Sequence, residues 1–180
     1  MCSLFRNKYR NETCWLTNHD YSSGGTYFIT ICTQRMVSYF GNISCRKMDK
    51  SESGRIANKI WYELPKHFSF VSLDAFVVMP NHVHGIVIID PMPIVGTLHA
   101  TSLQQQPTSA KNEFMSIISP KPGSLATVIR SYKSAVSKNV HLTDPGFSWH
   151  PRYYDHLIRS DRELDRIRNY IINNPVMWIP

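Results

Sequence analysis

The alternation of hydrophobic and polar positions predicts β-strands in four places. Residues 26–33 are rich in aromatic and β-branched side chains, and alternate residues of a strand lie on opposite faces. The residues expected to share one face of this strand are Tyr27, Ile29 and Ile31. Residues 75–79 and 85–89 are apolar runs on either side of a Pro-Asn-His-Val-His segment, which predicts a hairpin or two neighbouring strands. A further strand is expected over residues 153–158.

Apolar residues at helical spacing predict a first helix over about residues 50–64. Ile56, Ile60 and Leu64 recur every four residues, which places them on one side of that helix. Pro65 follows directly, and because proline lacks an amide hydrogen we expect it to end the helix.

Two more helices are predicted in the second half of the chain, each with a start signal. Ser124 is the expected N-cap of the first, whose apolar residues follow the helical period. The residues of this apolar stripe are Leu125, Val128, Ile129, Tyr132 and Val136. Ser160 and Glu163 match a capping box at the start of the last helix, which Pro175 is expected to end. The apolar residues of that helix are Leu164, Ile167 and Ile171.

The order of these elements predicts the fold class. Without the last helix, it is strand, helix, two strands, helix and strand, which is the order of a ferredoxin-like split β-α-β sheet. We therefore predict an α+β fold with one antiparallel sheet, helices on one face and an additional C-terminal helix. Residues 91–123 are rich in Pro, Ser, Thr and Gln, which indicates a long flexible loop within a single domain spanning residues 1–180.

Composition narrows the range of partners. The net charge of +7 favours polyanions, because each Lys or Arg placed at a phosphate releases condensed counterions. The four cysteines form no C-x-x-C pair, so we expect free thiols in a reducing cytoplasm rather than a structural zinc site. No apolar run approaches the length of a membrane-spanning helix. A cytoplasmic protein associated with nucleic acid is the resulting expectation.

The segment His82-Val83-His84 is the sharpest local signal for chemistry. Residues i and i+2 of a strand point to the same face, so the two imidazoles are expected to converge. Neutral imidazole is a common metal ligand, and a converging pair forms half of a metal site. The spacing itself is shared by any H-x-H in a strand, so two ordinary sheet histidines are the alternative.

Tyr170 and Asn174 form a second pair in the last predicted helix. They are four residues apart and therefore lie one turn above the other on the same helical side. A phenol serves as a nucleophile, and an amide oxygen is a neutral ligand for a hard cation. The alternative is structural, with Tyr170 packed at the edge of the apolar stripe and Asn174 capping the helix before Pro175.

Several ordered segments together resemble a known family. They are DYSSGGTYFITICTQR at 20–35, MPNHVHG at 79–85, SLATVIRSYKSAV at 124–136 and WHPRYYDHLIRSDRELDRIRNYIINNP at 149–175. The chain resembles the single-tyrosine transposases with a His-hydrophobic-His (HUH) motif, and within them the REP-associated tyrosine transposases. The resemblance covers most of residues 20–178 apart from the 91–123 loop.

The resemblance implies a reaction and assigns roles to residues. It implies cleavage and rejoining of single-stranded DNA through a 5′-phosphotyrosine, with Mg²⁺ or Mn²⁺ as cofactor and hairpins of palindromic repeats as substrate. Tyr170 matches the nucleophile on the catalytic helix, while His82 and His84 match the metal ligands. Asn174 matches the polar residue that completes the site, where related transposases often carry glutamine. Tyr153 and Tyr154 are rival nucleophiles by composition, but they match a strand motif of the family.

Candidate DNA contacts follow from charge and aromatic content. The cations expected to contact the DNA backbone, unless they are simply solvated, are Arg130, Lys133, Lys138, Arg152 and Arg159. The aromatic residues expected either to stack on bases or to pack in the core are Trp149, Tyr153 and Tyr154. Arg162, Arg166 and Arg168 alternate with acidic residues and indicate a solvated helix face.

Two other functions stay open at this stage. A replication initiator or relaxase uses the same pair of histidines and tyrosine, although such domains usually belong to larger proteins. A non-catalytic, ferredoxin-like protein that binds single-stranded nucleic acid would need neither Tyr170 nor a divalent ion. A homodimer is a further expectation for the transposase, and a decayed transposase would keep the fold without the activity.

Overall fold

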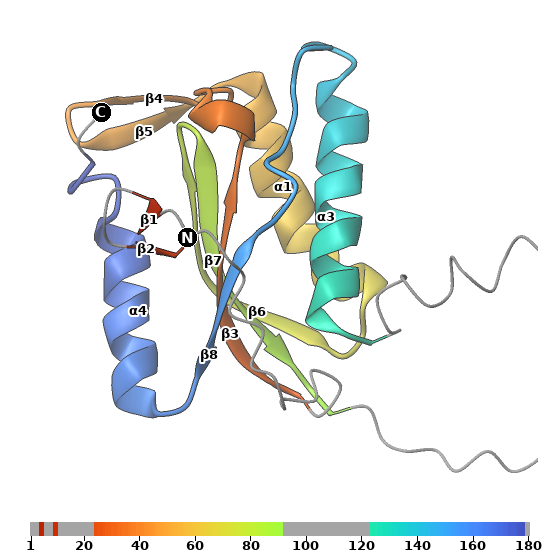
Figure 1. The fold of residues 1–180 in the computed structure, drawn as a ribbon, viewed down its shortest axis with the longest axis vertical. Coiled ribbons are helices and arrows are strands. Elements are labelled where there is room, and N and C mark those ends of the chain that lie inside the picture. Colours follow the sequence, from red (N-terminus) through yellow and green to blue (C-terminus); the bar gives the residue numbers. More distant parts are fainter. Residues whose placement is uncertain (1–3, 6–8, 11–23, 92–122, 179–180) are drawn as a thin grey trace, which may run out of the picture.

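A four-stranded antiparallel sheet forms the centre of the molecule. The computed structural model describes residues 4–5, 9–10, 24–91 and 123–178. Within these ranges the sheet has the order β6-β7-β3-β8 (Figure 1). Its strands are β3 (Gly25–Cys32), β6 (Val71–Met79), β7 (His82–Ile89) and β8 (Tyr154–Ile158). Two small hairpins lie outside it, β1 (Leu4–Phe5) with β2 (Tyr9–Arg10), and β4 (Gly41–Ser44) with β5 (Lys47–Lys50).

The helices cover both faces of this sheet. α1 (Glu52–His67) and α3 (Leu125–Val140) pack side by side on one face, and α4 (Asp161–Asn173) lies on the other (Figure 1). The order β3-α1-β6-β7-α3-β8 and the strand arrangement match the ferredoxin-like prediction, with α4 as the additional helix. The α+β prediction is therefore confirmed. Residues 92–122 of the predicted loop lie outside the described residues.

The larger core lies between the sheet and the pair α1 and α3. The predicted inward residues Tyr27, Ile29 and Ile31 are fully buried there. Trp61 of α1 stacks on Phe76 with ring centroids 4.3 Å apart. The predicted stripe of α3 is buried as well, and it consists of Leu125, Val128, Ile129, Tyr132 and Val136. A methyl group on Gly85 would lie 2.4 Å from the Trp61 ring, so a side chain at this position of β7 is excluded by close packing.

The prediction that Pro65 ends α1 was wrong. The helix continues through Pro65 to His67, and the amide of Phe68 donates to the carbonyl of Leu64. Pro65 removes one backbone hydrogen bond, the one that its amide would donate to the carbonyl of Trp61, and the helix continues for two residues beyond it. The fully buried side is formed by Ala57, Trp61 and Leu64, whereas Ile56 and Ile60 are half-buried at the margin of the core.

The smaller core lies between the sheet and α4. Ile167 and Ile171 of α4 pack against two residues of the sheet, Ile86 and Ile158. Ser160 accepts a hydrogen bond from the amide of Glu163, as expected for the predicted N-cap. The Glu163 carboxylate accepts hydrogen bonds from the amide of Arg159 and from the His156 ring, which fastens the start of α4 to β8.

Arg168 corrects the prediction that the charged residues of α4 form a solvated face. Its guanidinium donates at 2.9 Å and 3.1 Å to the carboxylate of Asp74 on β6. Asp74 lies in a β-bulge, where the register between β6 and β7 shifts between Leu73 and Phe76. This bidentate pair lowers the pKa of Asp74, chiefly through the hydrogen bonds from Arg168. α4 is therefore attached to the sheet by a charged contact in addition to its apolar side.

The β4–β5 hairpin was not predicted. The segment that precedes it, residues 33–40, is joined to the β6–β7 turn, because the amide of Thr33 donates to Asn81 and that of Phe40 donates to Pro80. The hairpin consequently lies at the end of the sheet where β7 begins (Figure 1). Its strands are only four residues each and mostly polar, which explains why alternation gave no signal.

Candidate active site

The two histidines of the His-Val-His segment begin strand β7 and lie on the α4 face of the sheet. Both imidazoles face the same side, as their spacing predicts, because Val83 between them is buried in the opposite core. Their Nε2 atoms are 3.0 Å apart. His82 and His84 are 7% and 5% exposed, so both rings are almost completely shielded from water.

Burial sets the charge of both rings. It lowers the pKa of His82 to about 4, because a buried imidazolium loses its hydration. The pKa of His84 is lowered well below its usual value, first by burial and then by repulsion from His82. Both rings are therefore neutral near pH 7, and a neutral imidazole offers the lone pair that a metal ion requires.

Residues outside the predicted site hold the two rings in place. Oδ1 of Asn81 accepts from Nδ1 of His82 at 2.7 Å, while Nδ2 of Asn81 donates to the carbonyl of Met36 at 3.2 Å. A neutral His82 that donates through Nδ1 keeps its lone pair on Nε2. On the other ring, Nδ1 of His84 is hydrogen-bonded to the Thr30 hydroxyl at 2.8 Å.

Sequence reasoning missed Asn81 and Thr30 for different reasons. Asn81 precedes His82 directly, so its proximity was visible in the sequence, although the direction of its side chain was not. Thr30 is 54 residues from His84 and meets it only through the register between β3 and β7, in which Thr30 pairs with His84. Alternation placed Thr30 on the correct face, but a single sequence does not define register.

Tyr170 reaches the histidine pair from α4. Its hydroxyl lies 3.3 Å from Nε2 of His84, the same atom that faces His82. The ring of Phe28 stacks on His84 with centroids 5.4 Å apart and contacts the edge of Tyr170 at 6.0 Å. Tyr170 is 48% exposed, so about half of this residue is in contact with solvent although it touches the buried pair. A phenol in this position is accessible to a large substrate.

Asn174 takes the C-cap position of α4, which agrees with the structural alternative considered for it. It is also 9% exposed and lies on the same side of the helix as Ile171, the side packed against the sheet. A buried amide one turn beyond Tyr170 is compatible with the predicted ligand role as well.

The rival tyrosines have different positions. Tyr153 packs against the larger core. Tyr154 pairs with Thr30 across β8 and β3, and its ring contacts Phe28 with centroids 6.3 Å apart, so it lies in the same row of the sheet as His84. The hydroxyl of Tyr170 lies 3.3 Å from Nε2 of His84, whereas Tyr153 is placed against the opposite core.

The histidine pair fits a divalent cation. Two ligands bound at right angles about 2.1 Å from one cation lie about 3.0 Å apart. The observed Nε2 separation is 3.0 Å. No group of three or more His, Cys, Asp or Glu side chains that would hold a metal occurs in the described part of the chain. Among the described residues, the Asn174 amide oxygen is the candidate for a further ligand, and water or substrate would supply others.

Of the five predicted DNA-contacting cations, Arg152 lies at the same end of the sheet as this site, because it precedes Tyr154, which pairs with Thr30 in the row of His84. Arg130 and Lys138 are exposed on α3, on the opposite face of the sheet. Lys133 donates to the carbonyls of His150 and Pro151, so its ammonium holds the loop before β8. Burial lowers the pKa of this group. Arg152 is exposed in the same loop, and Arg159 is exposed at the far end of β8, beside the start of α4.

The aromatic residue before β8 is also explained by packing. Trp149 donates from its indole to the carbonyl of Lys133 and packs against the larger core. Trp178, which was not predicted as part of the site, lies beside His82 with ring centroids 5.7 Å apart. The sequence offers no periodic signal for Trp178, because it follows the last helix.

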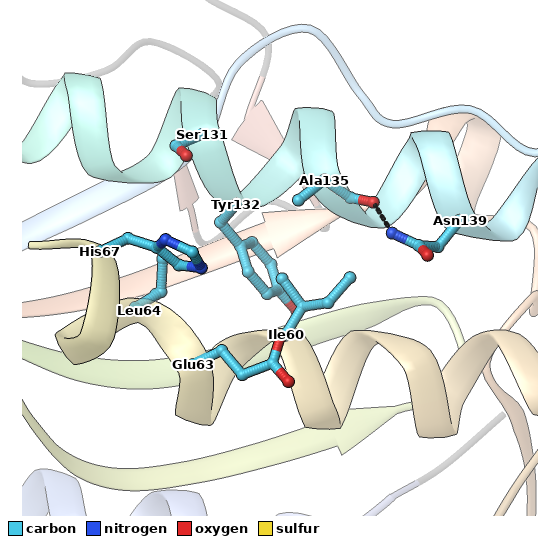
Figure 2. A pocket seen from close by; sticks show the side chains of 8 residues that line it. All are labelled: Ile60, Glu63, Leu64, His67, Ser131, Tyr132, Ala135 and Asn139. Carbon is cyan, nitrogen blue, oxygen red and sulfur yellow. Dashed lines mark hydrogen bonds between the residues drawn. The ribbon is translucent and has the colours of Figure 1, made fainter.

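A pocket of about 290 Å³ lies away from the histidines, between α1 and α3 (Figure 2). Ile60, Leu64 and Tyr132 line its inner part. The Asn139 amide at its rim donates to the carbonyl of Ala135 in its own helix, rather than into the pocket. Glu63, His67 and Ser131 also line the pocket, and no hydrogen bond joins their side chains in Figure 2.

Comparison with solved structures identifies the fold. A structure of a REP-associated tyrosine transposase bound to a REP hairpin aligns with a TM-score of 0.56 and 18% identity, over 89% of this chain and 72% of that one. A candidate transposase from Deinococcus radiodurans aligns with a TM-score of 0.44 and 15% identity, over 87% and 93% of the two chains. At these identities the first likeness establishes a transposase-like fold alone, and the second is too distant to add to it.

Comparison of sequences identifies relatives. No protein-family model matches the chain. None of the described helices is both long and apolar enough to cross a membrane. An uncharacterised protein of Haemophilus influenzae is 33% identical over 174 residues, which cover 91% of this chain and 87% of that protein. The chain therefore belongs to the same family as this Haemophilus influenzae protein, and its fold is transposase-like.

Proposed function

We propose that the chain is a metal-dependent, single-tyrosine DNA endonuclease and strand transferase that acts on hairpin-forming palindromic repeats. The observation that carries the proposal is the position of the Tyr170 hydroxyl, 3.3 Å from Nε2 of His84. That atom lies 3.0 Å from Nε2 of His82. A half-exposed phenol over a buried pair of neutral imidazoles is the arrangement that tyrosine-dependent phosphoryl transfer needs.

In the proposed reaction, the Tyr170 oxygen attacks a phosphorus atom of single-stranded DNA. A bond forms between the phenol oxygen and phosphorus, and the bond from phosphorus to the 3′ oxygen breaks. The phenol loses its proton, and the leaving 3′ oxygen gains one. The products are a 5′-phosphotyrosine and a free 3′-hydroxyl. Attack by a second 3′-hydroxyl then reverses the step and joins a new strand, so no nucleotide cofactor is needed.

His82 and His84 would hold Mg²⁺ or Mn²⁺, with Asn174 as a further ligand. When bound, such a cation supplies neutralisation of phosphate charge and stabilisation of the leaving oxygen. Other residues of the chain orient the metal ligands and the nucleophile. Asn81 and Thr30 fix the orientation of the imidazoles, and Phe28 packs between His84 and Tyr170. A free phenol ionises near pH 10, so deprotonation of Tyr170 requires assistance, which Nε2 of His84 would not provide while that atom holds a cation.

The proposed substrate rests on charge and on the related fold. The aligned tyrosine transposase is bound to a REP hairpin, and the net charge of this chain is +7. Both facts favour a folded, polyanionic nucleic acid. One chain already brings Tyr170 to its own histidine pair, so the predicted homodimer is not needed to assemble these three residues. The homodimer stays a prediction.

The experiment is a test for a covalent adduct. The purified chain is incubated with a labelled DNA hairpin carrying a single-stranded flank, in the presence of Mn²⁺, and the products are separated on a denaturing gel. We expect a protein-linked DNA band that is absent with a chelator, absent for Tyr170→Phe and absent for His84→Ala. Tyr154→Phe is the matched control, because this residue lies in the same row of the sheet and should keep the adduct.

Three outcomes would overturn the proposal. The first is an intact protein that yields no adduct on hairpins with either a 5′ or a 3′ flank. The second is an adduct that persists in Tyr170→Phe. The third is an adduct whose yield does not change when divalent ions are removed. Tight binding of hairpin DNA without any cleavage would support the alternative of a non-catalytic nucleic-acid-binding protein.

A further inference from the structure

Three described cations lie at the active-site end of the sheet in addition to Arg152, which the sequence singled out. Arg35 follows β3, and Arg46 and Lys47 lie at the tip of the β4–β5 hairpin. All three side chains are exposed. None of them forms an ion pair with a described residue, whereas Lys50 and Arg55 next to them are engaged with Asn58 and Glu52. We call Arg35, Arg46 and Lys47 the basic edge.

The basic edge is attached to the segment that positions His82. Asn81 donates to the carbonyl of Met36, the residue after Arg35, and accepts from the ring of His82. The amide of Phe40 donates to the carbonyl of Pro80, which fixes the chain that leads into the hairpin. In Figure 1 the hairpin extends from this end of the sheet toward the side covered by α4, where Tyr170 lies.

The backbone of the basic edge is unusual. Arg35 and Met36 have φ values of 54° and 58°, and Cys45 and Arg46 have values of 49° and 62°. Residues other than Gly, Asn and Asp rarely adopt this left-handed backbone conformation. Two-residue hairpin loops that need it usually have the sequence Asn-Gly. Both tight turns carry arginine instead. Unfavourable backbone conformations that persist in a fold are often found where a side chain is used for binding.

We propose that the basic edge binds the phosphate backbone of the DNA hairpin and directs its single-stranded flank to Tyr170. The inference rests on the proposed function, and it moves the main DNA contact away from α3. Arg130 and Lys138 lie on the face of the sheet opposite to the histidine pair, so a strand held there would have to pass around the sheet to reach Tyr170. The basic edge lies at the end of the sheet where β7 begins with the histidine pair.

The test measures how DNA affinity depends on salt. Fluorescence anisotropy is recorded with a labelled DNA hairpin carrying a single-stranded flank, between about 50 and 200 mM salt. The test variants are Arg46→Asn with Lys47→Gln, and separately Arg35→Asn. Asparagine tolerates the left-handed conformation, so the charge is removed without adding strain. The matched control is Lys59→Gln with Lys66→Gln, which removes two exposed charges from α1 on the opposite face.

Each lost phosphate contact lowers the slope of log affinity against log salt by about 0.9. The double variant of the basic edge should therefore lose about 1.8 from the slope. The fall in its affinity between about 50 and 200 mM salt should then be about tenfold smaller than that of the unaltered chain. Arg35→Asn should lose about half as much, and the α1 control should keep the slope of the unaltered chain. Urea unfolding of each variant establishes that the chain is folded.

The results distinguish this inference from the proposed function. An unchanged slope in both basic-edge variants, or a larger loss in Arg130→Gln with Lys138→Gln, overturns the basic edge even if the covalent adduct forms. A reduced slope in the basic-edge variants without any adduct from the unaltered chain supports the basic edge and overturns the nuclease. An unaltered chain that binds no hairpin overturns both.

Discussion

The two faces of the central sheet differ in how they are packed. The face covered by α1 and α3 is a broad apolar core, in which Trp61, Tyr27 and Tyr132 are among the largest fully buried side chains. The face covered by α4 has a small cluster of buried aliphatic residues. Beside this cluster lie buried polar groups, His82, His84 and Asn174, and the ion pair between Arg168 and Asp74.

The two faces are therefore expected to have different roles, one in stability and the other in chemistry. Burial of apolar area is the main stabilising contribution, so the α1 and α3 face should account for most of the free energy of unfolding. Buried imidazoles contribute little to that free energy, because their desolvation is unfavourable and is only partly offset by hydrogen bonds. The α4 face can therefore carry reactive groups because the opposite face maintains the fold.

The largest expected effect is on the α1 and α3 face. Trp61→Ala removes a fully buried ring that stacks on Phe76, and it should lower the free energy of unfolding by about 3–5 kcal/mol. Urea denaturation monitored by circular dichroism measures this change. Tyr62→Ala is the control, because Tyr62 is 55% exposed and its loss should cost less than about 1 kcal/mol. Equal effects of the two substitutions would contradict the assignment of the main core.

A smaller effect is expected from the aliphatic contact of α4. Ile171→Ala should lower the free energy of unfolding by about 2 kcal/mol, at the low end for such a truncation, because the cluster around it is small. Since Tyr170 is its neighbour, the rate of adduct formation should fall more steeply than the stability. Ile172→Ala is the matched control, as this next residue is 66% exposed. A loss of stability equal to that of Trp61→Ala would show that the two faces contribute alike.

The polar part of the α4 face is tested by a substitution of similar shape. Thr30→Val removes the hydroxyl that is bound to Nδ1 of His84, and loss of such a supporting contact typically weakens metal binding by about 10- to 100-fold. Calorimetric titration with Mn²⁺ measures the affinity. Thr26→Val, at the other end of the same face of β3, should leave it unchanged. If both variants bind Mn²⁺ as the unaltered chain does, the hydrogen bond to His84 has no role in metal binding.

The smallest effect is expected from the ion pair between α4 and β6. The hydrogen bonds from Arg168 lower the pKa of Asp74, so the folded state binds this proton more weakly than the unfolded state. The stabilisation is therefore present above the pKa of a free carboxyl, about 4, and is lost as the pH falls through the lower folded value. Arg168→Gln should shift the urea midpoint slightly at pH 7, and the shift should shrink below about pH 4.

A control on the same helix isolates this contact. Arg162 is exposed, and among the described residues it forms no ion pair, so Arg162→Gln should shift the midpoint at neither pH. A shift for Arg168→Gln that is independent of pH would assign its contribution to packing of the aliphatic stem instead of the charge.

Most of the fold was predictable because its elements have strong periodicity. The stripe of α3 and the alternation of β3 each bury the residues that the sequence indicated. The failures have physical causes. Pro65 removes a single amide hydrogen bond near the end of α1, and the helix continues past it to His67. The β4–β5 hairpin has no alternating pattern to detect.

The candidate site was predictable only as separate parts. The spacing of His82 and His84 indicated a shared face, but their contacts with Asn81, Thr30 and Tyr170 depend on strand register and on the docking of α4. The same holds for Arg168, whose partner Asp74 is 94 residues away in the sequence. Charge alone suggested Lys133 as a phosphate contact, whereas its ammonium is engaged with backbone carbonyls.

The most direct measurement of the central claim is identification of the residue that becomes attached to DNA. The covalent product is digested with nuclease and protease, and mass spectrometry locates the peptide that retains a nucleotide. The account predicts a nucleotide on the phenol oxygen of Tyr170, whose hydroxyl lies 3.3 Å from His84. A nucleotide attached to Tyr154 or to any other residue of the chain would contradict it.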